Sequence, residues 1–305
     1  MRAPRVLCIG GCHVDRKALA LAELQLAVSN PVTISTCFGG VARNVAENLC
    51  RLGNEVTLVS RLGADSDGAA ILEALRALPL RLDYLDTAPD TPTAFHLILL
   101  QPDGDMLVSV ADMRIYDQIS PQVLAAFPTA LWAVDAIFAD CNLSAESLAY
   151  LAAQRSADRR LAINAVSPAK APRAADALPA ADFLFVNGRE AAALVAPDNT
   201  DSDPESAARA LLDRGVGEVV VTLGAGGLLA ATPAEVLRLD SLPGPLRDVT
   251  GAGDALAAAF LDARLRGWSL TVAARRALAA ARVTIDCAES VSESLTPETL
   301  DQMMS

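Results

Sequence analysis

The chain has 305 residues, of which 52% are hydrophobic, and a formal net charge of −12 at pH 7. This length suits one large domain, and so acidic a chain lacks the basic face that nucleic-acid binding needs. No apolar run reaches the roughly 18 residues of a membrane span, and the N-terminus lacks a signal-peptide pattern, so we expect a cytoplasmic protein without membrane association.

Short apolar runs alternate with longer amphipathic runs rich in alanine and leucine along most of the chain. We expect buried strands at 6–9, 56–60, 136–139, 161–163, 183–186 and 218–223. We expect helices at 43–51, 67–77, 144–154 and 205–214. Repeated alternation of strand and helix predicts a mainly parallel sheet covered by helices, in a single domain that spans 1–305.

One region breaks this alternation. The runs 94–100 and 106–111 are strand-like, and the sequence Pro-Asp-Gly-Asp at 102–105 supplies the turn of a hairpin. Another extended run lies near 32–37. We predict a small sheet that projects from the main domain, acting either as a lid over a reacting phosphate or as an ordinary antiparallel extension. The segments expected to contribute to it are about 12–38 and 90–115.

The segment 248–254 reads Asp-Val-Thr-Gly-Ala-Gly-Asp and precedes a helical run at 255–266. Small residues at a helix N-terminus let backbone N–H groups approach an anion, and the helix dipole favours negative charge there. Gly251, Ala252 and Gly253 therefore form a candidate anion hole for a phosphate. Asp254 lies at its mouth, where a carboxylate accepts the proton of an attacking hydroxyl; a plain helix N-cap is the alternative.

A second segment, 39–46, reads Gly-Gly-Val-Ala-Arg-Asn-Val-Ala. The paired Gly39 and Gly40 allow the backbone to approach a ligand closely, and Asn44 offers both a donor and an acceptor to a sugar hydroxyl. Taken alone, the glycine pair also fits a simple turn between a strand and a helix.

Together, the two segments resemble the two signatures of the PfkB (ribokinase-like) carbohydrate kinase family. Gly53 and Gly63 stand at the family spacings after the first signature, and matching landmarks run from about residue 6 to residue 290. The resemblance implies a ribokinase-like three-layer α/β/α fold with a small β lid. It also implies an ATP- and Mg²⁺-dependent kinase of small sugars or nucleosides that assembles as a homodimer.

The resemblance further implies roles for individual residues of the acceptor site. Asp254 would be the catalytic base, beside the anion hole of 251–253. Asp15, after the first strand, would grip sugar hydroxyls in a site that Gly39, Gly40 and Asn44 also line.

Other matching residues would serve the nucleotide and the metal ions. Asn187 and Glu190, in an Asn-x-x-Glu segment, would help to hold magnesium and the ATP phosphates; a helix cap and a surface carboxylate are the alternatives. The loop beside the nucleotide would contain Thr222, Gly224 and Gly227. The positions at which many members bind a monovalent cation such as K⁺ are Asp248 and Thr250.

Within the family, several short segments resemble bacterial pseudouridine kinases; they lie at 29–31, 39–53, 110–113, 139–143 and 166–170. The favoured reaction is therefore transfer of the γ-phosphate of ATP to the 5′-hydroxyl of pseudouridine. Asp112 and Asn142 are candidate contacts to the base, unless they merely shape loops. Lys170 is a candidate contact to the ATP phosphates, unless it is a solvated surface lysine.

Two positions depart from that subgroup. Asn164-Ala165 stands where Asp-Pro is usual, and His13 stands where asparagine is common two residues before Asp15. The alternatives are a kinase for ribose, another furanose or an ordinary nucleoside such as adenosine or inosine. An alternative of a different class is a catalytically silent sugar-binding protein.

Overall fold

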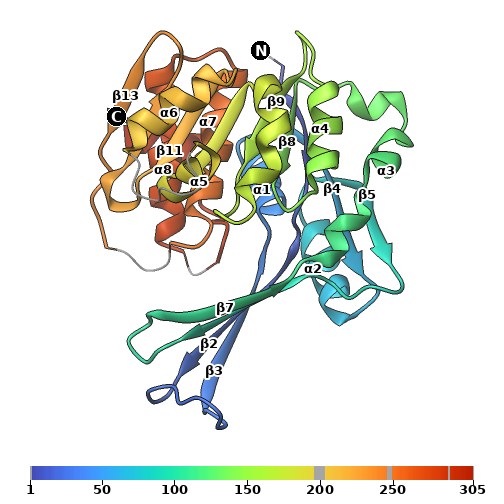
Figure 1. Cartoon of the computed structure of the whole chain (residues 1–305), viewed down its shortest axis with the longest axis vertical. Coiled ribbons are helices and arrows are strands. Elements are labelled where there is room, and N and C mark those ends of the chain that lie inside the picture. Colours follow the sequence, from blue (N-terminus) through green and yellow to red (C-terminus); the bar gives the residue numbers. More distant parts are fainter. Residues whose placement is uncertain (1, 196–202, 246–248, 288, 305) are drawn as a thin grey trace.

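A computed structural model describes residues 2–195, 203–245, 249–287 and 289–304. These residues form a nine-stranded main sheet and a separate four-stranded sheet that projects from one end of the main body (Figure 1).

The main sheet has the strand order β13-β12-β11-β10-β9-β8-β1-β4-β5. Its strands are β1 (Arg5–Ile9), β4 (Glu55–Gly63), β5 (Arg81–Ala88), β8 (Ala136–Asp140), β9 (Arg160–Asn164), β10 (Phe183–Asn187), β11 (Glu218–Thr222), β12 (Leu228–Ala231) and β13 (Val236–Leu239). Neighbours pair in parallel from β5 to β11, and β12 and β13 add antiparallel pairs at the edge. The central strands are buried on both faces, which explains why they read as continuous apolar runs.

Helices cover both faces of this sheet. They are α1 (Val41–Arg51), α2 (Ser66–Arg76), α3 (Pro121–Ala125), α4 (Ala145–Ala153), α5 (Gly188–Val195), α6 (Pro204–Asp213), α7 (Ala252–Leu265), α8 (Leu270–Ile285) and α9 (Pro297–Met304). Short 3₁₀ segments lie at Arg114–Gln118, Thr129–Trp132, Ala171–Ala180 and Gly224–Gly226. Among the described helices, none has both the length and the apolar character needed to cross a bilayer.

Alternate side chains of the central strands enter two separate cores. Leu7 and Ile9 of β1 pack with α4, α5 and α6 on one face, whereas Val6 and Cys8 pack with α1, α2, α7 and α8 on the other. This division follows from the two-residue period of a strand. The three-layer α/β/α arrangement predicted from the sequence is confirmed.

The small sheet has the order β3-β2-β6-β7 and consists of β2 (His13–Ala20), β3 (Val32–Gly39), β6 (Phe95–Leu100) and β7 (Met106–Asp112). β6 and β7 form the antiparallel hairpin that the turn at 102–105 predicts. β2 follows β1 after three residues, and β3 leads directly into α1. The small sheet is therefore joined to the main sheet at the carboxyl end of β1, where the candidate site residues converge.

Candidate active site

Asp254 is the third residue of α7, a helix that begins after Gly251 in the left-handed conformation (φ 78°). A Cβ atom at Gly251 would overlap the carbonyl oxygen of Ser290, so glycine is required here for both conformation and space. The helix start has no side-chain cap, and the alternative of Asp254 as an N-cap is therefore wrong. Its carboxylate is left to face a cavity at the N-terminus of the helix.

Asn44 lies between a guanidinium and the carboxylate of Asp254. Its Nδ2 donates to Asp254 Oδ2 at 2.8 Å, and its Oδ1 accepts from Arg43 Nη1 at 2.9 Å. Because a guanidinium can only donate, it fixes which end of the amide faces Asp254. The contact of Asn44 with a sugar hydroxyl stays a prediction; in the structure its amide holds the carboxylate of Asp254.

Burial raises the pKa of Asp254 to about 7. The hydrogen bond from Asn44 lowers this pKa, while the negative charges of Asp140, Asp15 and Glu190 raise it further. A carboxylate with a pKa near the working pH is well suited to general base catalysis.

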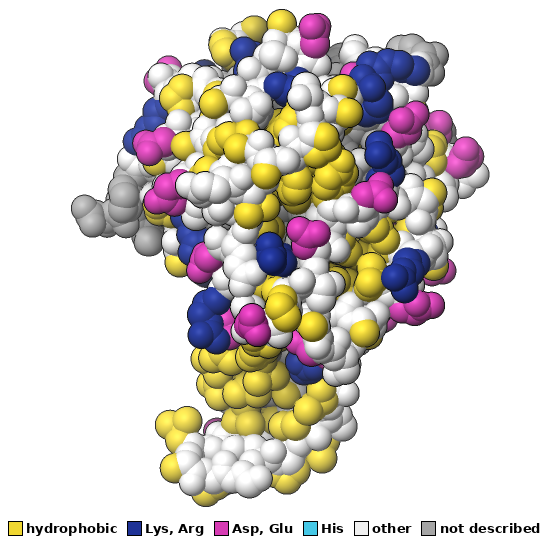
Figure 2. All heavy atoms as spheres, turned by 90° about the vertical axis from the view of Figure 1, so that its right-hand side faces the viewer, with side chains coloured by type: hydrophobic (Ala, Val, Ile, Leu, Met, Phe, Trp, Pro, Cys, Tyr) yellow, Lys and Arg dark blue, Asp and Glu magenta, His cyan; other side chains and the backbone are white. Residues whose placement is uncertain are grey.

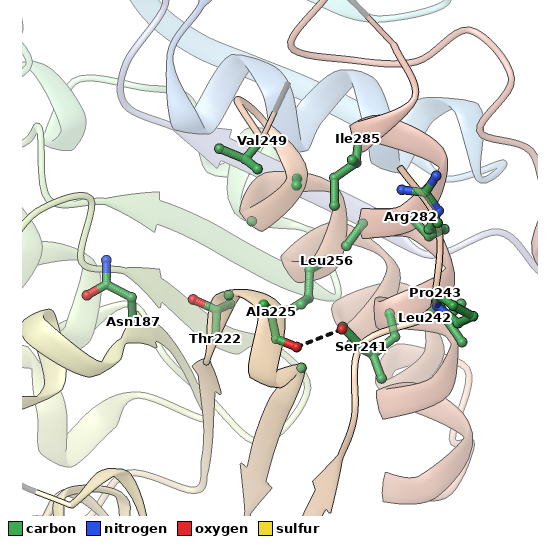
Figure 3. Close-up of a pocket in the computed structure, with 17 residues that line it drawn as sticks. Asn187, Thr222, Ala225, Ser241, Leu242, Pro243, Val249, Leu256, Arg282 and Ile285 are labelled. Atoms are coloured by element: carbon green, nitrogen blue, oxygen red, sulfur yellow. Dashed lines mark hydrogen bonds between the residues drawn. The ribbon is translucent and has the colours of Figure 1, made fainter. Parts of the chain in front are cut away.

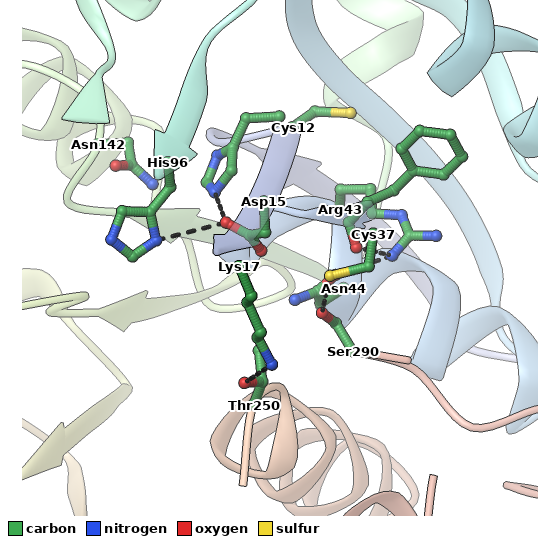
Figure 4. A network of polar contacts seen from close by, with 12 residues as sticks. Cys12, Asp15, Lys17, Cys37, Arg43, Asn44, His96, Asn142, Thr250 and Ser290 are labelled. Atoms are coloured by element: carbon green, nitrogen blue, oxygen red, sulfur yellow. Dashed lines mark hydrogen bonds and ion pairs between the residues drawn. The ribbon is translucent and has the colours of Figure 1, made fainter. Parts of the chain in front are cut away.

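Asp15 lies on β2 between the two histidines of the chain (Figure 4). Its Oδ1 is 3.4 Å from His13 Nε2 and 3.4 Å from His96 Nδ1. Burial raises the pKa of Asp15, but the hydrogen bonds and charges of the two histidines outweigh burial and hold that pKa well below its usual range. A Cβ at Gly39 would overlap Asp15 Oδ2, so Gly39 makes room for the carboxylate. The result is an ionised acceptor that suits a hydroxyl donor.

Gly40 joins β3 to α1 at a close crossing of the chain. Its φ is 100°, and a Cβ there would overlap the carbonyl oxygen of Gly11. Arg43 N donates to that same carbonyl at 3.0 Å, which fixes the start of α1 against the loop after β1.

Asp140, at the end of β8, is fully buried and joins two loops of the site to the start of α1. Its carboxylate accepts hydrogen bonds from the backbone N–H groups of Gly11 at 2.8 Å, Ala42 at 2.9 Å and Asn142 at 2.9 Å. Burial raises its pKa and the three donors lower it, with a net rise. Sequence reasoning did not single out this residue as a site residue, although it lies in the 139–143 segment.

Lys170 Nζ donates to Asn142 Oδ1 at 2.6 Å. Burial lowers the pKa of Lys170, against the opposing charge of Asp140. Lys170 is thus half-buried beside a candidate acceptor-site residue, and it is absent from the lining of the cavities near Thr222.

Asp112 stands apart from this cluster. Its carboxylate pairs with Arg114 Nη2 at 2.6 Å. In the strand register it is opposite Phe95, so it points to the other face of the small sheet from His96.

A cavity of about 600 Å³ lies between β11, α7 and α8 (Figure 3). Apolar side chains such as Leu242, Leu256 and Ile285 line it, as do all three residues expected beside the nucleotide: Thr222, Gly224 and Gly227. A smaller cavity of about 150 Å³ contains Asp254 and Glu190. The two cavities share Asn187, Thr222, Gly253 and Leu256.

Gly253 lines both cavities, and a Cβ there would meet no atom within 4 Å. A side chain at this position would therefore project into the space that both cavities border. A large, mainly apolar cavity that adjoins a smaller one containing Asp254 and Glu190 at a helix N-terminus fits a nucleotide, with its base in the first cavity and its phosphates in the second.

Asn187 and Glu190 form a reciprocal cap at the start of α5. Glu190 N donates to Asn187 Oδ1 at 2.9 Å, while Asn187 N and Nδ2 donate to the two oxygens of Glu190 at 2.8 and 2.7 Å. The alternative of a helix cap is thus present, but Glu190 is buried rather than a surface carboxylate. Burial raises its pKa. With both oxygens engaged by Asn187, Glu190 fits contact with Mg²⁺ through water rather than direct ligation.

Thr250 is the described member of the expected monovalent-cation pair, and its Oγ1 accepts from Lys17 Nζ at 2.9 Å (Figure 4). Asp248 lies outside the described residues. Within the described ranges, no group of three His, Cys, Asp or Glu side chains is placed to hold a metal ion.

Two contacts that sequence reasoning missed, those of His96 with Asp15 and of Lys17 with Thr250, involve residue types that are rare in this chain. The chain has two lysines and two histidines, and all four lie at this site: Lys17, Lys170, His13 and His96. A chain that uses arginine for almost all of its positive charge thus places its rare basic side chains in contact with polar groups of this site.

Comparison with known proteins finds relatives along nearly the whole chain. The profile described as pfkB family carbohydrate kinase matches residues 3–297. A pseudouridine kinase of Escherichia coli strain K12 is 29% identical over 288 residues, which are 92% of this chain and 90% of that protein.

Solved structures agree with the fold. A carbohydrate kinase from Agrobacterium tumefaciens is 32% identical, with a TM-score of 0.83 over 99% of this chain and 97% of that one. Arabidopsis thaliana ribokinase, complexed with ribose and ATP, has a TM-score of 0.83 at 21% identity, over 100% of this chain and 99% of that one. The ribokinase-like fold expected from the sequence is confirmed.

Proposed function

The chain belongs to the pfkB family of carbohydrate kinases, and we propose that it transfers the γ-phosphate of ATP to the 5′-hydroxyl of pseudouridine. The observation that carries the phosphotransfer is the position of Asp254 at the N-terminus of α7, with a pKa of about 7. In this role, Asp254 takes the proton of the acceptor hydroxyl as that oxygen attacks the γ-phosphorus.

The rest of the reaction needs charge stabilisation more than covalent chemistry. Within the anion hole predicted at 251–253, the backbone N–H of Ala252 donates to the carbonyl oxygen of Val249 at 3.3 Å. The N–H groups of Gly253 and Asp254, in the first turn of α7, would stabilise the negative charge on the transferred group. Asn187 and Glu190 would hold Mg²⁺ through water, and the ion would supply further compensating charge when bound. Thr222, Gly224 and Gly227 would flank the nucleotide.

The acceptor would lie between Asp15, Gly39 and Asn142. Ionised Asp15 accepts hydrogen bonds from adjacent ribose hydroxyls, and the Asn142 amide, whose oxygen is held by Lys170, offers its N–H groups to an acceptor atom. The relative from Escherichia coli supports pseudouridine among nucleosides. Ribose is the second candidate, because the Asp15 and Gly39 pair would suit any furanose.

The small sheet would act as a lid. It carries Asp15 and His96 on one face, so closing over the acceptor would exclude water from the phosphate.

The other face of the small sheet exposes apolar side chains: Ile34 is 62% exposed, Val110 53% and Val108 44%. Figure 2 shows hydrophobic side chains gathered over this projecting sheet. We propose that a second copy of the chain covers them in a homodimer, which light scattering of the purified protein tests.

The deciding experiment is ATP consumption with Mg²⁺ and K⁺ against pseudouridine, uridine, adenosine, inosine and ribose. Strong preference for pseudouridine over uridine supports the proposed substrate, whereas preference for ribose or a purine nucleoside shows that this other compound is the substrate.

Asp254→Asn should lower kcat by about 10²–10⁴-fold while ATP still binds. Turnover that persists in Asp254→Asn contradicts the assignment of the base. A need for ATP is consistent with the cytoplasmic location that the sequence predicts.

A further inference from the structure

Lys17 links the small sheet to the loop that precedes α7. It lies on β2 two residues after Asp15, so both side chains point to the same face of the sheet. Arg16, between them, points to the opposite face, where its Nη2 contacts the two oxygens of Asp67 at 2.7 and 2.8 Å. β2 therefore carries one cation toward the candidate site and one away from it.

The contact of Lys17 places its charge at the edge of the helix start. Lys17 Nζ donates to Thr250 Oγ1 at 2.9 Å (Figure 4), and Thr250 immediately precedes Gly251, the N-cap of α7. The residues joined by this bond are 233 positions apart in the sequence. A cation from the small sheet thus lies beside the N-terminus of α7, to which the proposed function assigns the transferred phosphate.

The groups around Lys17 indicate why a cation would be needed at this position. Four carboxyl groups lie in this site: Asp15 and Glu190 are buried, Asp140 is fully buried, and Asp254 is at the start of α7. A phosphoryl group in transfer spreads further negative charge over its oxygens and needs compensating cations. A charge-assisted bond from an ammonium to a phosphate oxygen is about twice as strong as a bond between neutral groups, and lysine's flexible stem allows its head to move between partners.

On the basis of the proposed kinase reaction, we propose that Lys17 is a further catalytic residue, whose ammonium contacts the γ-phosphate of ATP. In the reaction, the bond from the γ-phosphorus to the β,γ-bridging oxygen breaks and a bond to the acceptor oxygen forms. The acceptor proton passes to Asp254, ADP leaves with the bridging oxygen, and Lys17 keeps its proton throughout. Because β2 carries both Lys17 and Asp15, one movement of the sheet would seat the acceptor and deliver the cation.

The first test compares the affinities of MgATP and MgADP by titration calorimetry, without any acceptor. Lys17→Met should weaken MgATP about tenfold or more and leave MgADP within about twofold, because only ATP has the γ-phosphate. Arg16→Met is the matched control on the neighbouring position and should leave both affinities unchanged. Equal losses for the two nucleotides, or no loss for MgATP, overturn the proposal.

The second test is kinetic and uses the acceptor that the wild-type chain turns over best. Lys17→Met should lower kcat by about 10²-fold with the acceptor KM within about threefold, and Lys17→Arg should restore part of the rate. An unchanged kcat in Lys17→Met overturns the proposal. A wild-type chain that phosphorylates none of the tested acceptors contradicts the proposed function instead, while the difference between MgATP and MgADP still decides the role of Lys17.

Discussion

The side-chain amide of Asn44 donates to Oδ2 of Asp254 at 2.8 Å and so ties α1 to α7 across 210 positions of sequence. The opposite end of that amide is held by Arg43, whose guanidinium also pairs with Glu47 at 2.7 Å. The protonation of the proposed base therefore depends on a polar chain that runs along α1.

This relationship predicts the pH dependence of the reaction. Since only the ionised Asp254 accepts a proton, kcat/KM should rise with pH and level off above about 7. Asn44→Leu removes a donor that favours the charged carboxylate, so the pKa of Asp254 rises and the midpoint moves to higher pH. Rate profiles from about pH 5.5 to 9 measure this shift. Cys50→Ala, on the same helix, is the control, and an unmoved midpoint in Asn44→Leu contradicts the relationship.

The raised pKa of Asp254 also predicts a cost in stability. The pKa of this carboxyl is its ordinary 3.8 in the unfolded chain and about 7 in the folded one. As the pH rises between these values, the unfolded state releases a proton that the folded state keeps, so the free energy of unfolding falls. Above both values the penalty is constant.

Asp254→Asn removes this penalty and should raise the Tm at pH 8 more than at pH 4.5, as measured by calorimetry. An equal change in Tm at the two pH values would mean that the carboxyl of Asp254 is not destabilised by burial.

Gly39 provides a steric prediction for the acceptor site. A Cβ at this position overlaps Asp15 Oδ2, so Gly39→Ala should displace the carboxylate. A displacement of about 1 Å can cost about 10²-fold in rate, and we expect kcat/KM for the acceptor to fall by that order. Gly188→Ala, where a Cβ meets nothing within 4 Å, is the matched control. Normal acceptor kinetics in Gly39→Ala would separate Asp15 from acceptor binding.

Lys170 distinguishes the acceptor side of the site from the ATP side. Its bond to Asn142 Oδ1 at 2.6 Å predicts that Lys170→Met raises the KM for the acceptor by about tenfold and changes the KM for ATP by less than about threefold. Initial-rate kinetics with each substrate varied in turn give both values. The reverse pattern would support the sequence-based assignment of Lys170 to the ATP phosphates.

The parts of the fold that could be predicted from sequence are those with local signals. The buried strands β1, β4, β8, β9, β10 and β11 contain continuous apolar runs, and the β6–β7 hairpin has a turn sequence at its centre. The strand β5 was missed because its alternating exposure resembles a polar loop, and β12 and β13 because they are only four residues long.

The candidate site divides in the same way. Gly251 and Gly39 could be identified because a glycine within a motif signals backbone constraint, and both prove to have no room for a side chain. The partners of Asp15 could not be identified from the sequence, because His96 reaches Asp15 only through the long-range pairing of β2 with β6. The role of Arg43 depends on the side-chain directions along α1, and Lys17 meets Thr250 only when both sheets are in place.

The connectivity of the small sheet has a consequence for folding. Its two central strands pair Val14 with Phe95, so the sheet closes a loop that contains α1, β4, α2 and β5. Closing so long a loop costs chain entropy that local contacts cannot offset, so this sheet should assemble after β4 and β5 have joined β1. Its strands would then also be the first to separate in the native protein, and amide hydrogen exchange would proceed fastest there among the strands. The order in which the chain folds and the ease with which its acceptor site opens thus have the same topological cause.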